Sequence, residues 1–170
     1  MSHKLSWIKE AFSRHVQIMQ DGQLVGEMVR DIFGKDVTAS LNGIQLRFDV
    51  NGFLFHSVNV HRVDADNQII GHIELKFGKR AELNLTSGET YLWKRHNMLM
   101  REWDMILENP DGSPEREIVS YDLTRRFFED AGDITVSEDG HTPNLDVVIL
   151  TGLFIRNYFQ RRRRTAAAAS

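Results

Sequence analysis

The sequence predicts a mainly β protein, in which an antiparallel sheet of about twelve strands closes into a barrel around a buried C-terminal helix. Three observations predict this fold. The chain repeats itself, apolar and polar residues alternate between tight-turn signals, and a wholly apolar segment follows the last repeat. Internal repetition indicates an architecture before any other argument does, but it names no reaction.

The repeat is clearest in two segments that begin at Asp21 and Asp66. The first reads Asp-Gly-Gln-Leu-Val-Gly-Glu-Met and the second Asp-Asn-Gln-Ile-Ile-Gly-His-Ile, and Phe-Gly-Lys follows both, at residues 33–35 and 77–79. A third copy opens at Asp111 and then degenerates. We therefore expect three four-stranded repeats. Aligned positions should share the barrel-facing side, which pairs Leu46 and Phe48 with Tyr91 and Trp93, and Val58 and Val60 with Trp103 and Met105.

Residues 3–14 are predicted to form a short amphipathic helix before the first repeat. Leu5, Ile8 and Phe12 recur at spacings of three and four residues, with charged residues between them. We expect this helix to plug one end of the barrel. The alternative is that it lies at a membrane interface, with its apolar side in the lipid.

From Val16 onward the pattern changes to the period of two that is typical of half-buried strands. The clearest run is residues 44–50, in which four apolar residues alternate with Gln45, Arg47 and Asp49. Asn-Gly and Asp-Gly steps between such runs favour tight hairpins, because type I′ turns need positive φ at both central residues. The turn signals are Asp21-Gly22, Asn42-Gly43, Asn51-Gly52, Asp66-Asn67, Ser87-Gly88 and Asp111-Gly112.

The predicted C-terminal helix covers residues 143–160, with Thr142 as its N-cap and Pro143 at the first helical position. Apolar residues surround this helix on all sides, which indicates burial or lipid contact. Its uninterrupted apolar run, residues 147–155, is much shorter than the about 20 residues that a membrane span needs. A barrel of about twelve strands is too wide for its own side chains to fill, so we expect this helix inside it.

Composition limits the classes of function. The chain has 170 residues and a net charge of −3, so it has no overall positive charge that would attract nucleic acid. It contains no cysteine, which excludes disulfides and thiolate chemistry and fits a cytoplasmic location. No apolar signal segment or transmembrane span is indicated. We expect one domain over residues 1–160, followed by a basic and Ala-rich tail over residues 161–170, of which residues 165–170 should be frayed.

The chain resembles the tubby C-terminal-like superfamily. The residues that carry the resemblance are 146–159, Asp-Val-Val-Ile-Leu-Thr-Gly-Leu-Phe-Ile-Arg-Asn-Tyr-Phe, which are similar to the aliphatic central helix of the small LURP-one-related and YxjI-like proteins. With the repeat pattern, the resemblance covers residues 16–160 and points to the small bacterial members. It implies the barrel with a central helix. Tubby domains bind phosphoinositides through a basic pocket, and scramblases carry an acidic calcium-binding stretch. This sequence has no matching basic cluster, and its acidic residues lack EF-hand spacing. No functional residue is therefore carried over from either group.

No catalytic residue, metal site or cofactor is indicated. His56 and His61 point to opposite faces of a predicted strand, and His61 meets at most His72 across a hairpin, which is too few ligands for a metal. The carboxylates fall at outward strand positions, and no pair is placed for acid–base work.

Basic residues at the two ends of the chain are the candidate lipid-binding residues. The run of four arginines directly follows the predicted buried helix, and near an anionic lipid surface each basic residue contributes about 1 kcal/mol. The alternative is that these charges only complement the helix dipole and keep the tail in water. The candidates are Lys4, Lys9, Arg14, Arg161, Arg162, Arg163 and Arg164.

These patterns favour a non-enzymatic binding or scaffold module, associated peripherally with anionic phospholipid or with a protein partner. One alternative is a carrier that holds a small apolar ligand in the barrel, which requires the helix to lie elsewhere. The other is an enzyme with a site in loops 109–142, where the repeat degenerates. That segment contains Arg116, Asp122, Arg125, Arg126 and His141.

Overall fold

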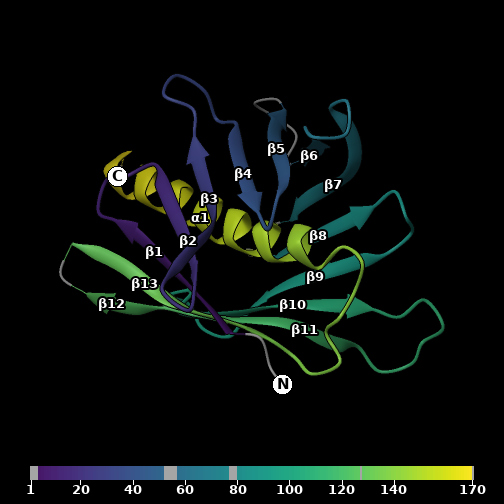
Figure 1. The fold of residues 1–170 in the computed structure, drawn as a ribbon. Coiled ribbons are helices and arrows are strands. Elements are labelled where there is room, and N and C mark those ends of the chain that lie inside the picture. Colours follow the sequence, from purple (N-terminus) through teal and green to yellow (C-terminus); the bar gives the residue numbers. More distant parts are fainter. Residues whose placement is uncertain (1–3, 52–56, 77–79, 127, 170) are drawn as a thin grey trace.

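The computed structural model describes residues 4–51, 57–76, 80–126 and 128–169, with the side chains of residues 51, 125 and 126 excepted. In the described residues, one antiparallel sheet of thirteen strands surrounds a single C-terminal helix, and Figure 1 shows their arrangement. The strands are β1 (Lys4–Glu10), β2 (His15–Gln20), β3 (Gln23–Arg30), β4 (Val37–Leu41), β5 (Ile44–Asn51), β6 (Ser57–Arg62), β7 (Gln68–Lys76), β8 (Arg80–Leu85), β9 (Thr90–Arg95), β10 (Glu102–Glu108), β11 (Arg116–Asp122), β12 (Thr124–Arg126) and β13 (Glu129–Val136).

The sheet closes on itself, as the sequence predicts. Neighbouring strands pair in chain order from β1 to β11, and β13 then pairs with β11 on one side and with β1 on the other. β12 pairs with the first part of β13, and β11 pairs with the last part of β13. β11 and β12 therefore occupy one strand position in the barrel, with a break at Leu123. The closed barrel therefore has twelve strand positions.

The predicted N-terminal helix over residues 3–14 is wrong. Residues 4–10 form β1, in which Leu5 and Trp7 are buried and their neighbours are not. β1 fills the gap between β2 and β13, which would otherwise be two open edges with unpaired backbone groups. Nε1 of Trp7 also donates a hydrogen bond to the carbonyl of Asp122, at 3.2 Å. Ring closure therefore decides the structure of a segment whose apolar spacing also fits a helix.

Tight turns join the strands at several of the predicted sites. At Asp21-Gly22 and Asn42-Gly43, both residues have positive φ, which is the backbone that a type I′ turn requires. The Asn51-Gly52 site extends beyond the described residues, and so does the second Phe-Gly-Lys segment, residues 77–79.

Helix α1 (Leu145–Ala169) runs through the barrel (Figure 1). Residues 147–156 and Phe159 are buried. The helix begins two residues later than predicted, because the carbonyl of Asn144 accepts the first helical hydrogen bond, from the Val148 amide at 3.0 Å. It also ends later. Residues 161–169 continue the helix beyond the barrel, although residues 165–170 were predicted to fray.

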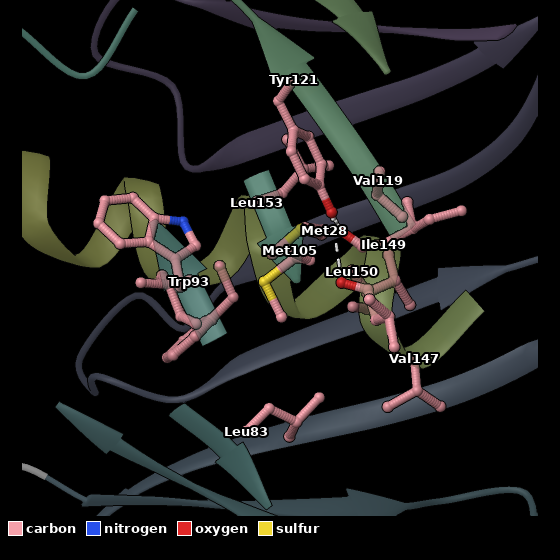
Figure 2. Packing of buried hydrophobic residues seen from close by; sticks show 14 of the residues in the cluster. Met28, Leu83, Trp93, Met105, Val119, Tyr121, Val147, Ile149, Leu150 and Leu153 are labelled. Carbon is pink, nitrogen blue, oxygen red and sulfur yellow. Dashed lines mark hydrogen bonds between the residues drawn. The ribbon is translucent and has the colours of Figure 1, made fainter. Parts of the chain in front are cut away.

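Wall aromatics hold the helix in place. The Phe48 ring stacks on Phe154, with centroids 4.4 Å apart. Nε1 of Trp103 donates to the carbonyl of Gly152, at 3.2 Å. The hydroxyl of Tyr121 points at the helix backbone and donates to the carbonyl of Ile149, at 2.9 Å (Figure 2). The aligned pairs from the sequence repeat all face the interior, since Leu46, Phe48, Tyr91, Trp93, Val58, Val60, Trp103 and Met105 are buried.

The two ends of the barrel differ. At one end, here called the helix-exit end, the C-terminal part of α1 leaves the barrel beside loops 11–14, 31–36 and 96–101 and Phe128. At the opposite end α1 begins, and polar contacts fasten it to the turns. Asn42 Nδ2 donates to Asp146 Oδ1 at 3.0 Å, and Asn144 Nδ2 donates to Glu89 Oε2 at 3.3 Å.

Candidate functional site

A pocket of about 350 Å³ lies at the helix-exit end, between α1 and the wall formed by β1 to β4. We call it the exit pocket. Five basic side chains from four separate segments line it: Lys9 of β1, Arg14 of the β1–β2 loop, Arg30 at the end of β3, and Arg161 and Arg164 of α1. The antiparallel order of β1 to β3 brings these segments to one end, because successive turns alternate between the two ends of a meander.

The bottom of the exit pocket is apolar. Val16 of β2, Met28 of β3 and Val37 of β4 line it from the wall, and Phe154 lines it from the helix. All four side chains belong to the buried core. The pocket therefore combines a basic rim with an apolar floor.

The backbone between the basic residues is fixed by hydrogen bonds. The Arg30 amide donates to the carbonyl of Arg14 at 3.1 Å, and Nη1 of Arg14 donates to the carbonyl of Arg30 at 2.9 Å. These contacts hold the β1–β2 loop against the end of β3. Arg14 and Arg30 are thereby held next to each other in the pocket lining.

The described lining of the exit pocket includes no carboxylate. Burial, followed by repulsion from Arg30, lowers the pKa of Arg161 to about 10. Burial, followed by repulsion from Arg164, also lowers the pKa of Lys9, and Asp130 opposes this shift. Glu10, Glu129 and Asp130 lie in a neighbouring hollow on the other side of Lys9 and Arg164. An anion in the exit pocket would relieve the repulsion among its cations.

A second hollow of about 240 Å³ lies beside the exposed part of α1, lined by Arg101, Leu123, Arg163 and Arg164 among others. Arg162 is exposed, with its Cζ atom 6.0 Å from the Tyr158 ring centroid. The arginines of the C-terminal run therefore surround the helix as it leaves the barrel, rather than facing one direction.

The structure brings together most of the predicted basic residues. Lys9, Arg14, Arg161 and Arg164 share the exit pocket, whereas Lys4 lies at the other end of β1 and pairs with Asp133 at 2.7 Å. Sequence reasoning missed Arg30. The signal that locates it is strand direction, since Arg30 ends a strand that is antiparallel to β2 and so returns to the end where Arg14 lies.

Exposed apolar side chains gather at the same end. Phe33 is fully exposed, Phe12 is 94% exposed and Phe128 is 76% exposed. Phe12 and Phe128 also have positive φ, 61° and 64°, which is costly for bulky residues. The two are neighbours in the fold, because the Ala11 amide donates to the Phe128 carbonyl at 2.6 Å. Among the described residues, the exposed large apolar side chains of the exit-end loops are Phe12, Ile32, Phe33, Met98, Leu99 and Phe128.

Other candidate residues do not form a comparable cluster. Nε2 of His61 lies 3.5 Å from Oδ2 of Asp49, and Nε2 of His72 lies 3.7 Å from Oε1 of Glu74. His56 is outside the described residues. Within the described part of the chain, no group of three His, Asp or Glu side chains is placed to hold a metal ion.

The alternative site in loops 109–142 is not assembled by the described residues. Arg116 and Asp122 lie at opposite ends of β11. Oδ1 of Asp122 accepts a hydrogen bond from the Asp133 amide, at 2.8 Å. The side chains of Arg125 and Arg126 lie outside the described part of the structure, and His141 is exposed in the segment that leads to α1.

Helix α1 is the one helix of the described residues, and it does not combine the length and the apolar character that a membrane-crossing helix requires. Comparison with protein-family models, curated proteins and solved structures finds no match.

Proposed function

We propose that this protein is a non-enzymatic binding module that attaches peripherally to anionic phospholipid surfaces through its helix-exit end. One observation carries the proposal: the loop residues with the most exposed aromatic rings and the basic residues of the exit pocket lie at the same end of the barrel. A lipid surface offers both partners that such an end needs, an anionic headgroup layer and an apolar layer beneath it.

The physical chemistry of the two residue types is complementary. Each basic residue near an anionic surface contributes about 1 kcal/mol, and this attraction weakens as salt screens it. Exposed aromatic side chains such as Phe33 and Phe128 gain free energy when they leave water for the interfacial region. The strained backbone at Phe12 and Phe128 supports a role for the rings at these turns, because such strain is commonly retained at functional positions.

The carrier alternative is less well supported than surface attachment. The volume that an apolar ligand would need inside the barrel is occupied by α1, whose residues 147–156 are buried. A ligand would have to displace this helix and break the contacts that Phe48 and Trp103 make with it.

We also propose that the ring consists of three four-stranded repeats: β2–β5, β6–β9, and β10, β11 and β13 completed by β1. Support comes from a register shift in the first hairpin of each repeat, at Ile18/Met19, Val60/His61 and Met105/Ile106. The barrel with its apolar central helix likewise supports the proposal that the chain is a small member of the tubby C-terminal-like superfamily.

Vesicle co-sedimentation tests the membrane proposal. We expect binding to phosphatidylcholine vesicles that contain phosphatidylglycerol, little binding to phosphatidylcholine alone, and release at high salt. The double variants Phe33→Ser/Phe128→Ser and Arg162→Gln/Arg163→Gln should each weaken binding. All four residues lie outside the exit-pocket lining.

Matched controls come from the rest of the molecule. Leu24→Ser removes a half-exposed apolar side chain at the opposite end, and Lys4→Gln/Arg116→Gln removes two charges there. Both controls should bind as the unchanged protein does. If the unchanged protein ignores anionic vesicles at low salt, or if the controls weaken binding as much as the exit-end variants, the proposal is wrong.

A further inference from the structure

We propose that the exit pocket binds a phosphomonoester, with the phosphate group against the basic rim and a short alkyl part on the apolar floor. Phe12 is shared between this pocket and the exposed loop residues of the proposed function, whereas Phe33 and Phe128 lie outside the pocket lining. For a phosphate carried by a lipid, the inference rests on that function; for a soluble phosphomonoester, it does not.

The rim favours a compact, highly charged anion. Lys9, Arg30 and Arg161 reach the opening from β1, β3 and α1, so a ligand between them meets cations from three directions. A phosphomonoester carries a charge of about −2 near neutral pH and three terminal oxygens. Guanidinium groups match such oxygens with paired N–H donors, which gives hydrogen bonds strengthened by charge. A monovalent carboxylate would leave more of this positive charge uncompensated.

The floor favours an apolar group attached to the phosphate. Val16, Met28 and Phe154 line the pocket below the rim. Its volume of about 350 Å³ lies in the range of small-molecule sites, which begins at about 300 Å³. Each methylene group that leaves water on this floor should raise affinity about fourfold.

Titration calorimetry with soluble probes tests the pocket without any membrane. We compare inorganic phosphate, butyl phosphate and butanol. Butyl phosphate should bind most tightly, inorganic phosphate more weakly by about tenfold or more, and butanol more weakly than either. This order of affinities separates the contributions of rim and floor. Butyl phosphate shares its phosphate group with inorganic phosphate, and it shares its alkyl chain with butanol.

Single-charge variants locate the binding site. Arg161→Gln should weaken butyl phosphate binding about tenfold or more, since it removes one charge-assisted contact. The matched control is Arg163→Gln, which makes the same change two residues further along α1 but outside the exit-pocket lining. It should leave binding nearly unchanged. Melting temperatures of both variants verify that they fold.

A third set of measurements identifies the source of the phosphate. Vesicles with phosphatidic acid, a monoester, are compared with phosphatidylglycerol vesicles of equal surface charge, with and without butyl phosphate as competitor. Preference for phosphatidic acid that butyl phosphate abolishes assigns a lipid headgroup. Binding of butyl phosphate without that preference assigns a soluble ligand. Both results uphold the pocket.

Three results would overturn the inference: neither phosphate probe binds at low salt, butyl phosphate binds no more tightly than inorganic phosphate, or Arg161→Gln and Arg163→Gln weaken binding equally. The proposed function fails separately. If vesicle binding depends on Phe33 and Phe128 while no phosphate probe binds, the membrane proposal holds and the pocket proposal fails. If phosphate probes bind but vesicles do not, the pocket proposal holds and the membrane proposal fails.

Discussion

Gly152 of α1 lies directly against the hydroxyl end of Tyr121 on β11, closer than any side chain at that position would allow. A Cβ atom at Gly152 would overlap the Oη atom and reach 2.8 Å from Cε2 of the same ring. The Tyr121 hydroxyl in turn donates to the carbonyl of Ile149 at 2.9 Å. The absence of a side chain at one position therefore sets how closely the helix approaches the wall.

Gly152→Ala should destabilise the protein by about 1–3 kcal/mol, because the added methyl group forces the helix and the Tyr121 ring apart. Urea denaturation measures the change. The double variant Gly152→Ala/Tyr121→Leu should lose less stability than the sum of the single variants, since the smaller side chain leaves room for the methyl group. Strictly additive losses would show that the close approach has no energetic consequence.

Removal of the central helix should abolish folding. A chain that ends at Asn144 lacks every buried side chain of α1, and large aliphatic side chains contribute about 1.5–3 kcal/mol each when fully buried. Leu150→Asp should have a similar effect, because an unpaired carboxylate cannot be solvated at that buried position. Circular dichroism during heating checks both. The control ends at Thr165, which removes exposed residues, and should melt as the full chain does.

Arg156 is the buried cation of the core, and its loss should cost about 3 kcal/mol. Its Cζ atom lies 5.5 Å from the Trp7 ring centroid and 5.6 Å from that of Trp103, and Nη1 lies 3.5 Å from Oδ2 of Asp130. Arg156→Met keeps the volume but removes the charge that faces Asp130. Chemical denaturation of Arg156→Met and of Arg156→Met/Asp130→Asn separates the loss of the Arg156 charge from the cost of leaving the Asp130 carboxylate without that charge. The double variant should be more stable than Arg156→Met. The reverse order would show that the Asp130 carboxylate does not depend on Arg156.

Alkaline pH should weaken the fold partly through Tyr91. Burial, with the hydrogen bond to Glu89, raises the pKa of Tyr91 from 10.0 to about 12. The folded state therefore holds the proton more tightly than the unfolded state, so this contribution to stability is complete below pH 10 and is lost as pH rises towards 12. The free energy of unfolding should fall less steeply in Tyr91→Phe over that interval. Parallel curves for the two proteins would contradict the prediction.

Gly26 and Gly71 should respond alike to substitution if the first two repeats are equivalent. At both positions a Cβ atom would collide with a backbone carbonyl of the next strand, at Ser40 and at Asn84. We expect Gly26→Ala and Gly71→Ala to destabilise by similar amounts, about 1–3 kcal/mol each, in urea denaturation. A large loss at one position and none at the other would count against the repeat. Gly22→Ala, with positive φ but open space around it, tests the backbone contribution alone.

Much of the fold could be predicted because its strongest signals are local. Two patterns indicate secondary structure from residues close together in sequence: the alternation in residues 44–50 and the apolar run 147–155. The segment 4–10 could not be predicted in this way. Its few apolar residues fit both helical and strand spacing, and the choice is made by the two free edges of β2 and β13, which lie far away in sequence.

The candidate site was predictable only in part, for a related reason. Arg161 and Arg164 were candidates because the run of arginines is visible in the sequence, and Arg14 because it was one of the basic residues of the amphipathic helix predicted over residues 3–14. Arg30 stands alone between apolar and acidic residues, and only the antiparallel pairing of β2 with β3 brings it beside Arg14. Lys4 does not join the exit pocket, because residues 4–10 form a strand that places Lys4 and Lys9 near its two ends.

The pairing of β1 with β13 also has a consequence for how the chain acquires its shape. β1 can pair with β2 as soon as both strands have been made, but its other partner, residues 129–136, is synthesised much later. During that interval β1 exposes one unpaired edge, with Leu5 and Trp7 uncovered, and such edges invite association between chains. The pairing of β1 with β13 joins the two strands of the sheet that lie furthest apart in sequence, and contacts of such high sequence separation favour slow folding. During synthesis, the free edge of β1 therefore stays open to association with other chains until β13 is available to cover it.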